Sequence, residues 1–328
     1  MIAKLRPLLD PYIGLMLATV VLAALFPAEG RGAVAAGIAA DAGVIFLFFL
    51  YGSRLSLSDA VQGMMRWKLH VAVLLSTFVL FPVLGLSITM LLQNGLPAAL
   101  VTGIMFLCVL PSTVQSSIAF TSIARGNVPA AICAASASNL LGVIISPFLA
   151  SWLLQTQGAE LSFSVFRDII LLLLAPFVAG QIMRRWIGDW VQRHKAVLGY
   201  ADRGSILVII YVAFSRGVVD RIWNQLDLAD LFVLLLLLAI LLTIVLATTS
   251  FLAKNILHLA REDQIVLQFC GSKKSLASGL PMAAIIFSGP KLGMIVIPLM
   301  IFHQMQLIAC AVLSRKYASV REDTDQRS

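Results

Sequence analysis

Charged residues are scarce in this sequence of 328 residues. They make up 12% of the chain, whereas 60% of the residues are hydrophobic. A soluble domain of this length carries about twice that fraction of charge. Together with a mean hydropathy of +0.95, this scarcity excludes an ordinary water-soluble domain and indicates a protein whose solvent is lipid.

Motifs of several soluble enzyme classes are also absent. The four cysteines (Cys108, Cys133, Cys270 and Cys310) stand singly in apolar stretches and form no CxxC pair, so we interpret them as small buried residues. No GxxxxGK[ST] loop or HExxH sequence occurs, which leaves nucleotide-driven pumping and zinc proteolysis without support. The net charge is +8, but the basic residues lie between apolar runs and not on one face, so we expect no nucleic-acid partner.

Long apolar stretches, by contrast, are abundant. Ten of them approach the roughly 20 residues that a helix needs to cross the hydrocarbon. They lie at residues 11–28, 36–54, 69–93, 98–123, 128–155, 165–184, 200–219, 228–256, 264–288 and 292–313. Unpaired backbone cannot face lipid, so each stretch should be a helix. The sequence predicts an all-α polytopic membrane protein, and we treat the first stretch as a retained span because a second follows it closely.

Lysine and arginine are distributed unevenly between the two ends of these spans. With the N-terminus in the cytoplasm, 17 of the 24 basic residues fall on the cytoplasmic side and five on the other, the remaining two being Lys273 and Lys274. The positive-inside rule therefore predicts that both termini are cytoplasmic, as in a multi-pass protein of a bacterial-type inner membrane.

Ten spans divide into two groups of five, and an odd number inverts the second group relative to the first. We expect residues 1–185 to hold the first repeat and the start of the second. Residues 186–199, with Trp186 and Trp190 among charges, should be an interfacial amphipathic linker. Residues 200–314 should complete the second repeat, and 315–328 should be a cytoplasmic tail.

The fourth span of each half is interrupted by polar residues. The sequence PSTVQSS (Pro111–Ser117) interrupts span 4, and GSKKSLASG (Gly271–Gly279) interrupts span 9. Either interruption alone could be a structural kink. Matched interruptions in two halves are the usual sequence sign of a transport site at the membrane midplane.

Two adjacent lysines, Lys273 and Lys274, occupy the second interruption. A lysine at the bilayer centre costs roughly 2.5–3.5 kcal/mol on insertion scales. One of them could extend to the interface, but both are less easily accommodated in this way. Asp41 in span 2 is the only carboxylate that looks embedded, and nothing places it near span 9. A cation surrounded by hydroxyls and amides suits an anion. The candidate substrate- or ion-binding residues are Ser112, Thr113, Gln115, Ser116, Ser117, Thr121, Ser136, Ser138, Asn139, Ser272, Lys273, Lys274, Ser275, His303 and Gln306. His303 could instead bond a backbone group.

Several segments resemble the bile acid:sodium symporter superfamily, in its divergent symporter-like branch. They are ARGN (Ala124–Asn127), GVIFLFFLYGSRLSL (Gly43–Leu57), SNLLGVIISP (Ser138–Pro147), KSLASGLPM (Lys274–Met282) and FHQMQ (Phe302–Gln306). The resemblance covers essentially the whole chain. It implies ten helices, a panel of spans 1, 2, 6 and 7, a core domain, and spans 4 and 9 crossing at their breaks.

The sodium-binding pattern that the resemblance implies is altered here. Ser117–Ile118 stands where sodium-coupled members have Ser-Asn, and Phe269, Lys273 and Lys274 stand where they have Glu, Gln and Asn. Sodium prefers oxygen ligands, whereas an ammonium offers only donors. Any sodium would lie near Ser117 and Ser272. A buried lysine could instead exchange a proton, so sodium or a proton is the expected coupling ion and no other cofactor is expected.

The leading hypothesis is a symporter-like secondary transporter of a small organic anion that works by alternating access. The alternative is a non-transporting membrane regulator of ion or lipid homeostasis, in which the breaks would be vestigial. An intramembrane enzyme would need a Ser–His pair built on His303, and the sequence shows no nucleophile motif for one. We therefore expect no enzymatic activity.

Overall fold

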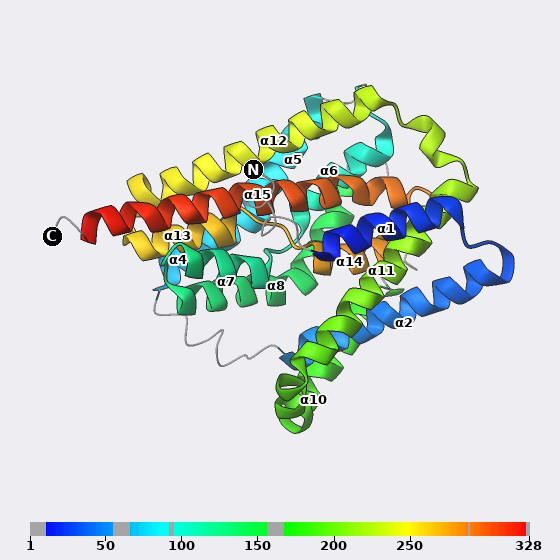
Figure 1. The fold of residues 1–328 in the computed structure, drawn as a ribbon, viewed down its shortest axis with the longest axis horizontal. Helices are drawn as coiled ribbons and strands as arrows, with labels where there is room; N and C mark the ends of the chain where they lie inside the picture. The colour runs from blue at the N-terminus through cyan, green and yellow to red at the C-terminus, as the bar shows by residue number, and fades with distance from the viewer. Residues whose placement is uncertain are drawn as a thin grey trace.

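The computed structural model describes residues 11–54, 66–91, 95–155, 167–168, 170–287 and 289–325. Within these residues the chain is helical and contains no strand (Figure 1). The first half comprises α1 (Pro11–Leu25), α2 (Gly30–Arg54), α4 (Trp67–Leu75), the π-helix η4 (Ser76–Leu80), α5 (Phe81–Leu91), α6 (Ala98–Val109), α7 (Val114–Ile123) and α8 (Val128–Gln155). The second half comprises η5 (Ile170–Leu174), α10 (Ala175–Arg193), α11 (Lys195–Val219), η6 (Ile222–Gln225), α12 (Leu228–Phe251), η7 (Leu252–Ile256), α13 (Arg261–Gly271), α14 (Leu276–Ile286) and α15 (Leu292–Asp325).

Seven described helices are long and apolar enough to cross a membrane. They lie at Gly30–Arg54, Trp67–Leu91, Val128–Leu153, Ile170–Arg193, Lys195–Val219, Leu228–Ile256 and Leu292–Ser319, and the bent pair α6 and α7 makes an eighth candidate span. The other two predicted spans correspond to α1, whose described part is short, and to the pair α13 and α14, which is rich in polar residues. The chain is therefore a multi-pass membrane protein.

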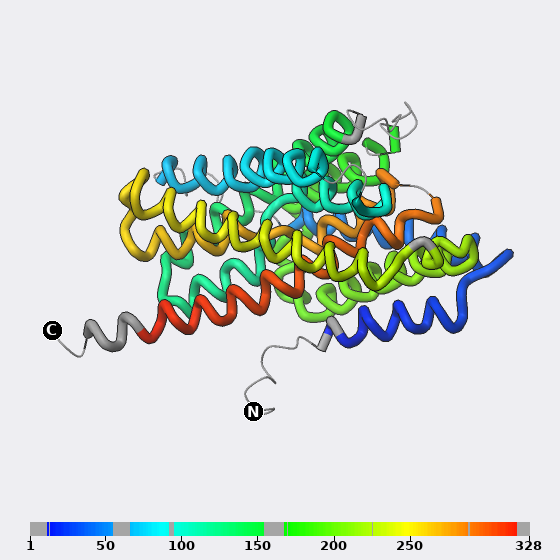
Figure 2. Tube along the Cα trace, turned by 90° about the horizontal axis from the view of Figure 1, so that it is seen from above, coloured from blue at the N-terminus to red at the C-terminus, as the bar shows by residue number. Residues whose placement is uncertain are grey.

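Helices α1, α2, α10 and α11 form one packed group (Figure 1). Where α2 crosses α10, a Cβ on Gly52 would lie 2.1 Å from the carbonyl oxygen of Phe177, and one on Gly180 would lie 2.1 Å from that of Phe49. The two glycines thus let the backbones touch, as small residues do in membrane helix pairs. In the view of Figure 2, α1 lies beside α11 at one edge of the molecule.

The remaining long helices form a second group around α6, α13 and α15. Helix α15 contacts α6, α12 and α14, while α13 contacts α4, α7, α8 and α12. A Cβ on Gly103 of α6 would lie 2.3 Å from the carbonyl oxygen of Ile295, so α6 and α15 also touch closely. The two groups meet where α11 packs against α14 and α15.

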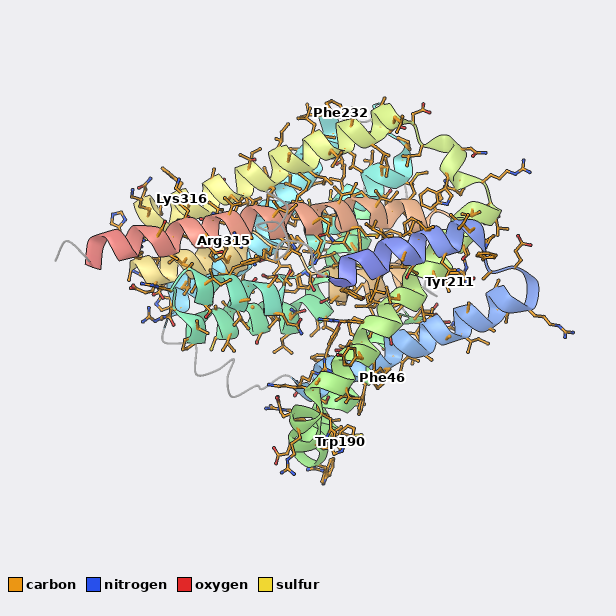
Figure 3. All side chains as sticks on the ribbon, in the orientation of Figure 1. Phe46, Trp190, Tyr211, Phe232, Arg315 and Lys316 are labelled. Carbon is orange, nitrogen blue, oxygen red and sulfur yellow. The ribbon has the colours of Figure 1, made fainter. Side chains whose placement is uncertain are left out.

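Apolar side chains cover much of the outer surface. Phe46 on α2, Phe232 on α12 and Trp190 on α10 are 36%, 69% and 54% exposed (Figure 3). In water such a surface would be unfavourable, whereas in a bilayer it faces lipid tails.

The structure adds detail to three segments of the sequence prediction. Within residues 186–199, α10 continues to Arg193 and α11 begins at Lys195 after a turn at His194. From residue 315, where a cytoplasmic tail is predicted, α15 continues as a helix to Asp325. Both breaks are shorter than predicted, since α7 begins at Val114 and α14 begins at Leu276. Their later polar residues lie in the first helical turns.

Candidate functional site

The two breaks contact each other directly, and we call the region where they meet the crossing. The Ser275 amide donates to the Pro111 carbonyl at 2.9 Å, and the Thr113 hydroxyl donates to the Lys274 carbonyl at 2.9 Å. The Ser112 hydroxyl donates to the Cys270 carbonyl at 2.6 Å. Backbone groups that each helix cannot satisfy at its interruption are therefore satisfied by the other interruption, as a membrane interior requires.

Local sequence explains both interruptions. Pro111 disfavours helical geometry in the preceding residue, and Leu110 is extended, with φ −72° and ψ 155°. Across this break α6 and α7 bend by 62°. In the second break Ser275 is extended and its hydroxyl accepts from the Ser278 amide, which is an N-cap that restarts the helix as α14.

The side chain of Lys274 extends from the second break, and it is fully buried. It donates to the carbonyl oxygens of Thr77 at 2.8 Å, Cys108 at 2.8 Å and Leu110 at 2.7 Å. The ring of Phe81 lies 4.1 Å from the nitrogen. All three protons of the ammonium thus have an acceptor.

These carbonyls are available for reasons that the sequence dictates. Cys108 and Leu110 lie at the C-terminal end of α6, where helical carbonyls lack an intrahelical donor. Thr77 lies in the π-helix η4, in which its carbonyl would pair with the amide five residues on. That residue is Pro82, which has no N–H. Lys274 therefore joins three unsatisfied carbonyls from two helices.

Lys273 is equally buried, with 0% exposure, but its surroundings differ. Its nitrogen has no hydrogen-bond partner among the residues that the structure describes, and it lies 4.1 Å from the ring of Phe120 and 5.5 Å from that of Phe269. The possibility that one of the lysines reaches the interface is therefore wrong for both, because neither side chain is exposed.

Gln306 links α15 to the second break. Its side-chain oxygen accepts from the Lys274 amide at 2.8 Å, and its side-chain nitrogen donates to the Lys274 carbonyl at 2.9 Å. The same nitrogen lies 3.0 Å from Nδ1 of His303. His303 is therefore connected to the break through Gln306.

A cavity of about 790 Å³ opens on the other side of the crossing, between the two helix groups. The first turns of both α7 and α14 line it, together with residues from α2, α8, α11 and α15. Its apolar wall includes Phe48, Leu140, Val143, Phe177 and Ile206.

The predicted site residues divide between these two sides of the crossing. Thr113, Gln115, Ser116, Ser136, Asn139, Ser275 and His303 line the cavity, and we call all of them except Asn139 and His303 the cavity face. Ser112, Ser117, Ser272, Lys273, Lys274 and Gln306 are buried outside the cavity, and we call them the inner face. Ser138, whose hydroxyl accepts from the Ser112 amide, and Thr121 are also buried away from the cavity. Asp41 lies on α2 with an exposed side chain and outside the cavity.

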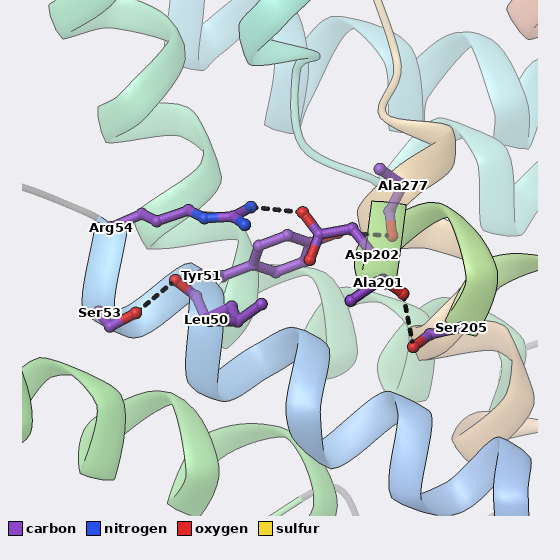
Figure 4. A network of polar contacts seen from close by, with 8 residues as sticks. All are labelled: Leu50, Tyr51, Ser53, Arg54, Ala201, Asp202, Ser205 and Ala277. Atoms are coloured by element: carbon purple, nitrogen blue, oxygen red, sulfur yellow. Dashed lines mark hydrogen bonds and ion pairs between the residues drawn. The ribbon is translucent and has the colours of Figure 1, made fainter. Parts of the chain in front are cut away.

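Sequence reasoning missed several residues of the cavity wall, namely Tyr12, Tyr51, Arg54, Lys195, Asp202 and Arg203. Arg54 lies in the last turn of α2, and its guanidinium forms an ion pair with Asp202 of α11 (Figure 4). The sequence did offer one signal: the aromatic Tyr51 and the charged Arg54 lie one turn apart at the end of span 2.

Tyr51 connects the two helix groups. Its hydroxyl donates to the Ala277 carbonyl in the first turn of α14 at 3.1 Å (Figure 4). In a regular helix that carbonyl would accept from residue 281, which is a proline without an N–H. Pro281 therefore leaves an acceptor that Tyr51 uses.

Comparison with known proteins agrees with this architecture. The model of the SBF-like CPA transporter family matches residues 10–319. The chain belongs to this family. It is 47% identical to the Pseudomonas aeruginosa protein named "Uncharacterized protein PA2026", over 97% of this chain and 96% of that one. It is 45% identical to the Escherichia coli protein named "Putative symporter YfeH", over 96% and 94% of the two chains. It is 31% identical to the rat protein named "Sodium/bile acid cotransporter 7", over 82% and 80%.

Membership of this family confirms the resemblance seen in the sequence and makes the chain a membrane transporter. A transporter family gives no support to an intramembrane enzyme, and it does not favour the alternative of a non-transporting regulator. The two broken helices and the cavity beside them are then the natural place to look for the transport site.

Proposed function

We propose that the chain is a secondary active transporter of a small organic anion. The observation that carries this proposal is the cavity into which the first turns of α7 and α14 both open. The N-terminus of a helix presents amides without intrahelical acceptors and a partial positive charge, which favours an anion. A volume of about 790 Å³ lies within the range of small-molecule sites.

The charges on the cavity wall support the same substrate class. Among the described residues, Arg54, Lys195 and Arg203 line it together with one acidic residue, Asp202. Aromatic and aliphatic residues make up much of the remaining wall. This combination suits an amphipathic anion, with its charge near the half-helix ends and its apolar part against Phe48 and Phe177. The bile acids in the name of the rat relative are of this kind.

The inner face argues against a sodium ion at the positions that the resemblance implies. Sodium would need oxygen ligands. The three carbonyls near Lys274 already accept from its ammonium, and the nitrogen of Lys273 faces rings and has no hydrogen-bond partner. The hydroxyls of Ser117 and Ser272 donate to the carbonyls of Phe269 and Gln268, at 3.0 and 2.5 Å. The residues present do not fit sodium, and we propose that Lys274 supplies a fixed charge in its place.

In this proposal the molecule works by alternating access as ten spans in two inverted repeats. The group α1, α2, α10 and α11 would be the panel, and the core would carry the crossing helices. Both termini would be cytoplasmic in a bacterial-type inner membrane, so the ends of α2 and α10 that carry Arg54 and Arg193 would face the cytoplasm. The hydrogen bond from the Tyr51 hydroxyl to the Ala277 carbonyl would have to break whenever the panel moves relative to the core.

The test is a screen of small organic anions, including taurocholate and pantoate, for thermal stabilisation of the purified protein with sodium or with choline as the cation. We expect at least one anion to raise Tm in both salts, because ligand binding stabilises the folded state. A variant with the cavity filled, Ser136→Phe, should lose this response. If no anion in the screen stabilises the protein, or if organic cations do so instead, the assignment of substrate class is wrong.

A further inference from the structure

The two buried lysines of the second break differ in what holds their protons. The ammonium of Lys274 has three donors and three carbonyl acceptors at 2.7–2.8 Å. If it lost a proton, one carbonyl would lose its donor and would face a nitrogen lone pair. The geometry therefore keeps Lys274 charged.

Nothing comparable holds the protons of Lys273. Its nitrogen is buried and has no hydrogen-bond acceptor in the described part of the chain, and the rings of Phe120 on α7 and Phe269 on α13 lie beside it. A cation–π contact stabilises a cation only weakly compared with the cost of removing that cation from water. The neutral amine, by contrast, leaves no charge to compensate.

The other groups around Lys273 do not change this balance. The thiol of Cys270 on α13 and that of Cys310 on α15 are its electrostatic neighbours. Tyr317 on α15 lies against the ring of Phe269, at 6.1 Å between centroids, and Lys274 is the next residue along the chain. None of these is a carboxylate, so Lys273 has no anionic partner among them.

We propose that Lys273 is the proton-exchanging group of this transporter and that Lys274 is a permanent cation. The step is the loss of one proton from the Lys273 ammonium to water, which leaves the neutral amine, and its reversal. No other bond forms or breaks. The assignment rests on the proposed function, because it gives the transporter a coupling ion in place of sodium.

The position of Lys273 links its charge to a half-helix that lines the substrate cavity. Phe120, whose ring covers the nitrogen, belongs to α7, and the first turn of α7 lines the cavity. Ser117 lies between these two parts of α7 and bonds the Phe269 carbonyl on α13. A change of charge at Lys273 therefore acts on the contact between α7 and α13, on one of the half-helices that we expect to bind the anion.

The test observes both nitrogens without any substrate. The full chain, labelled with ¹⁵N at the lysine side-chain nitrogen and held in lipid nanodiscs, is titrated by NMR. The two signals are assigned as those missing from Lys273→Arg and Lys274→Arg. We expect the Lys273 signal to change from ammonium to neutral amine at a pH at which the exposed lysines are still protonated, while the Lys274 signal remains that of an ammonium. If Lys273 titrates together with the exposed lysines, or if Lys274 loses its proton first, the proposal is wrong.

A matched pair of ring variants sharpens the result. Phe120→Leu removes the ring over Lys273 and should move its proton loss to lower pH, whereas Phe81→Leu removes the ring over Lys274 and should leave that ammonium protonated. An unchanged Lys273 titration in Phe120→Leu would contradict the role of the ring. Because these measurements contain no anion, a titrating Lys273 in a chain that binds no anion would count against the proposed function alone. Anion uptake that is independent of both pH and Lys273 would count against this inference alone.

Discussion

The cavity face and the inner face of the crossing are built from adjacent residues but have opposite properties. Ser112 is buried on the inner face and Thr113 lines the cavity; Lys274 is buried and Ser275 lines the cavity. Successive side chains in an extended backbone point to opposite sides, and the last residue of each break, Thr113 or Ser275, is extended. A short break therefore gives the protein one face that holds the crossing together and one that is free to bind.

This division implies that substitutions on the two faces should have different consequences. Changes on the inner face should reduce both stability and transport, because they remove partners of buried groups. Changes on the cavity face should reduce transport with little loss of stability.

The largest effect is expected at Lys274. Lys274→Met keeps much of the volume but leaves the carbonyls of Thr77, Cys108 and Leu110 without their donor. Breaking a buried hydrogen-bonded charge costs roughly 3–5 kcal/mol. We expect Tm to fall and uptake of the best anion from the screen into proteoliposomes to be abolished.

Lys274→Arg is the control, since it keeps the charge but not the geometry of the three contacts. It should be less destabilising than Lys274→Met and should transport poorly. Wild-type stability and uptake in Lys274→Met would show that the inner face does not hold the crossing together.

A smaller effect is expected at Asn139, which lies on the boundary between the faces. Its side-chain nitrogen donates to the Ser112 carbonyl at 3.0 Å, and its oxygen accepts from Ser278 at 2.9 Å. Asn139→Ala should cost about 1–3 kcal/mol, because it removes both hydrogen bonds and leaves the Ser112 carbonyl without this donor, whereas the Ser278 hydroxyl keeps its contact with Ser275. Uptake should fall about tenfold, because a free-energy loss of this size in the transporting conformation lowers its population by roughly that factor.

Gln115→Ala provides the matched comparison, because Gln115 is an amide of the cavity face with an exposed side chain. It should change uptake without lowering Tm. If the two variants lose the same stability, the distinction between the boundary and the cavity face is not supported.

A still smaller change is expected for Tyr51→Phe, which deletes only the hydroxyl that donates to Ala277. One neutral hydrogen bond contributes about 1 kcal/mol. The variant should remain folded and should shift the balance between the conformations of the panel and the core by roughly fivefold. Accessibility of a cysteine introduced at Ala119, on the cavity wall, to a membrane-impermeant thiol reagent would measure that shift. The same reagent rate in Tyr51→Phe and in the parent would show that this contact does not restrain the panel.

The sequence was sufficient to predict the helical membrane class, the positions of both breaks and the burial of polar residues around them. Pro111 and Gly271, each followed by a cluster of polar residues, mark the two breaks, so these features can be found from local sequence. Contacts between distant helices cannot be found in that way. The pair of Arg54 and Asp202 joins residues 148 positions apart, so the place of Arg54 at the end of a span does not reveal its partner.

The different environments of the two lysines were also beyond the sequence. The hydroxyls and amides expected around them suggested an anion site, but the cavity does not include either lysine side chain. The two lysines differ because only Lys274 reaches carbonyls that lack a backbone donor. These carbonyls lack one because Pro82 has no N–H and because α6 ends nearby. Pro82 could have been noted as a proline inside a span, but its spatial relation to residue 274 could not.

The smallest effect is expected from removing sodium. If the ammonium of Lys274 already satisfies the three carbonyls, a sodium ion has no oxygen ligands left there to bind. Uptake in proteoliposomes should therefore be unchanged when choline replaces sodium, and it should respond to an imposed proton gradient. A strict requirement for sodium would show that the ion binds elsewhere on the crossing, and the comparison between the two faces would then have to include an ion on the cavity face.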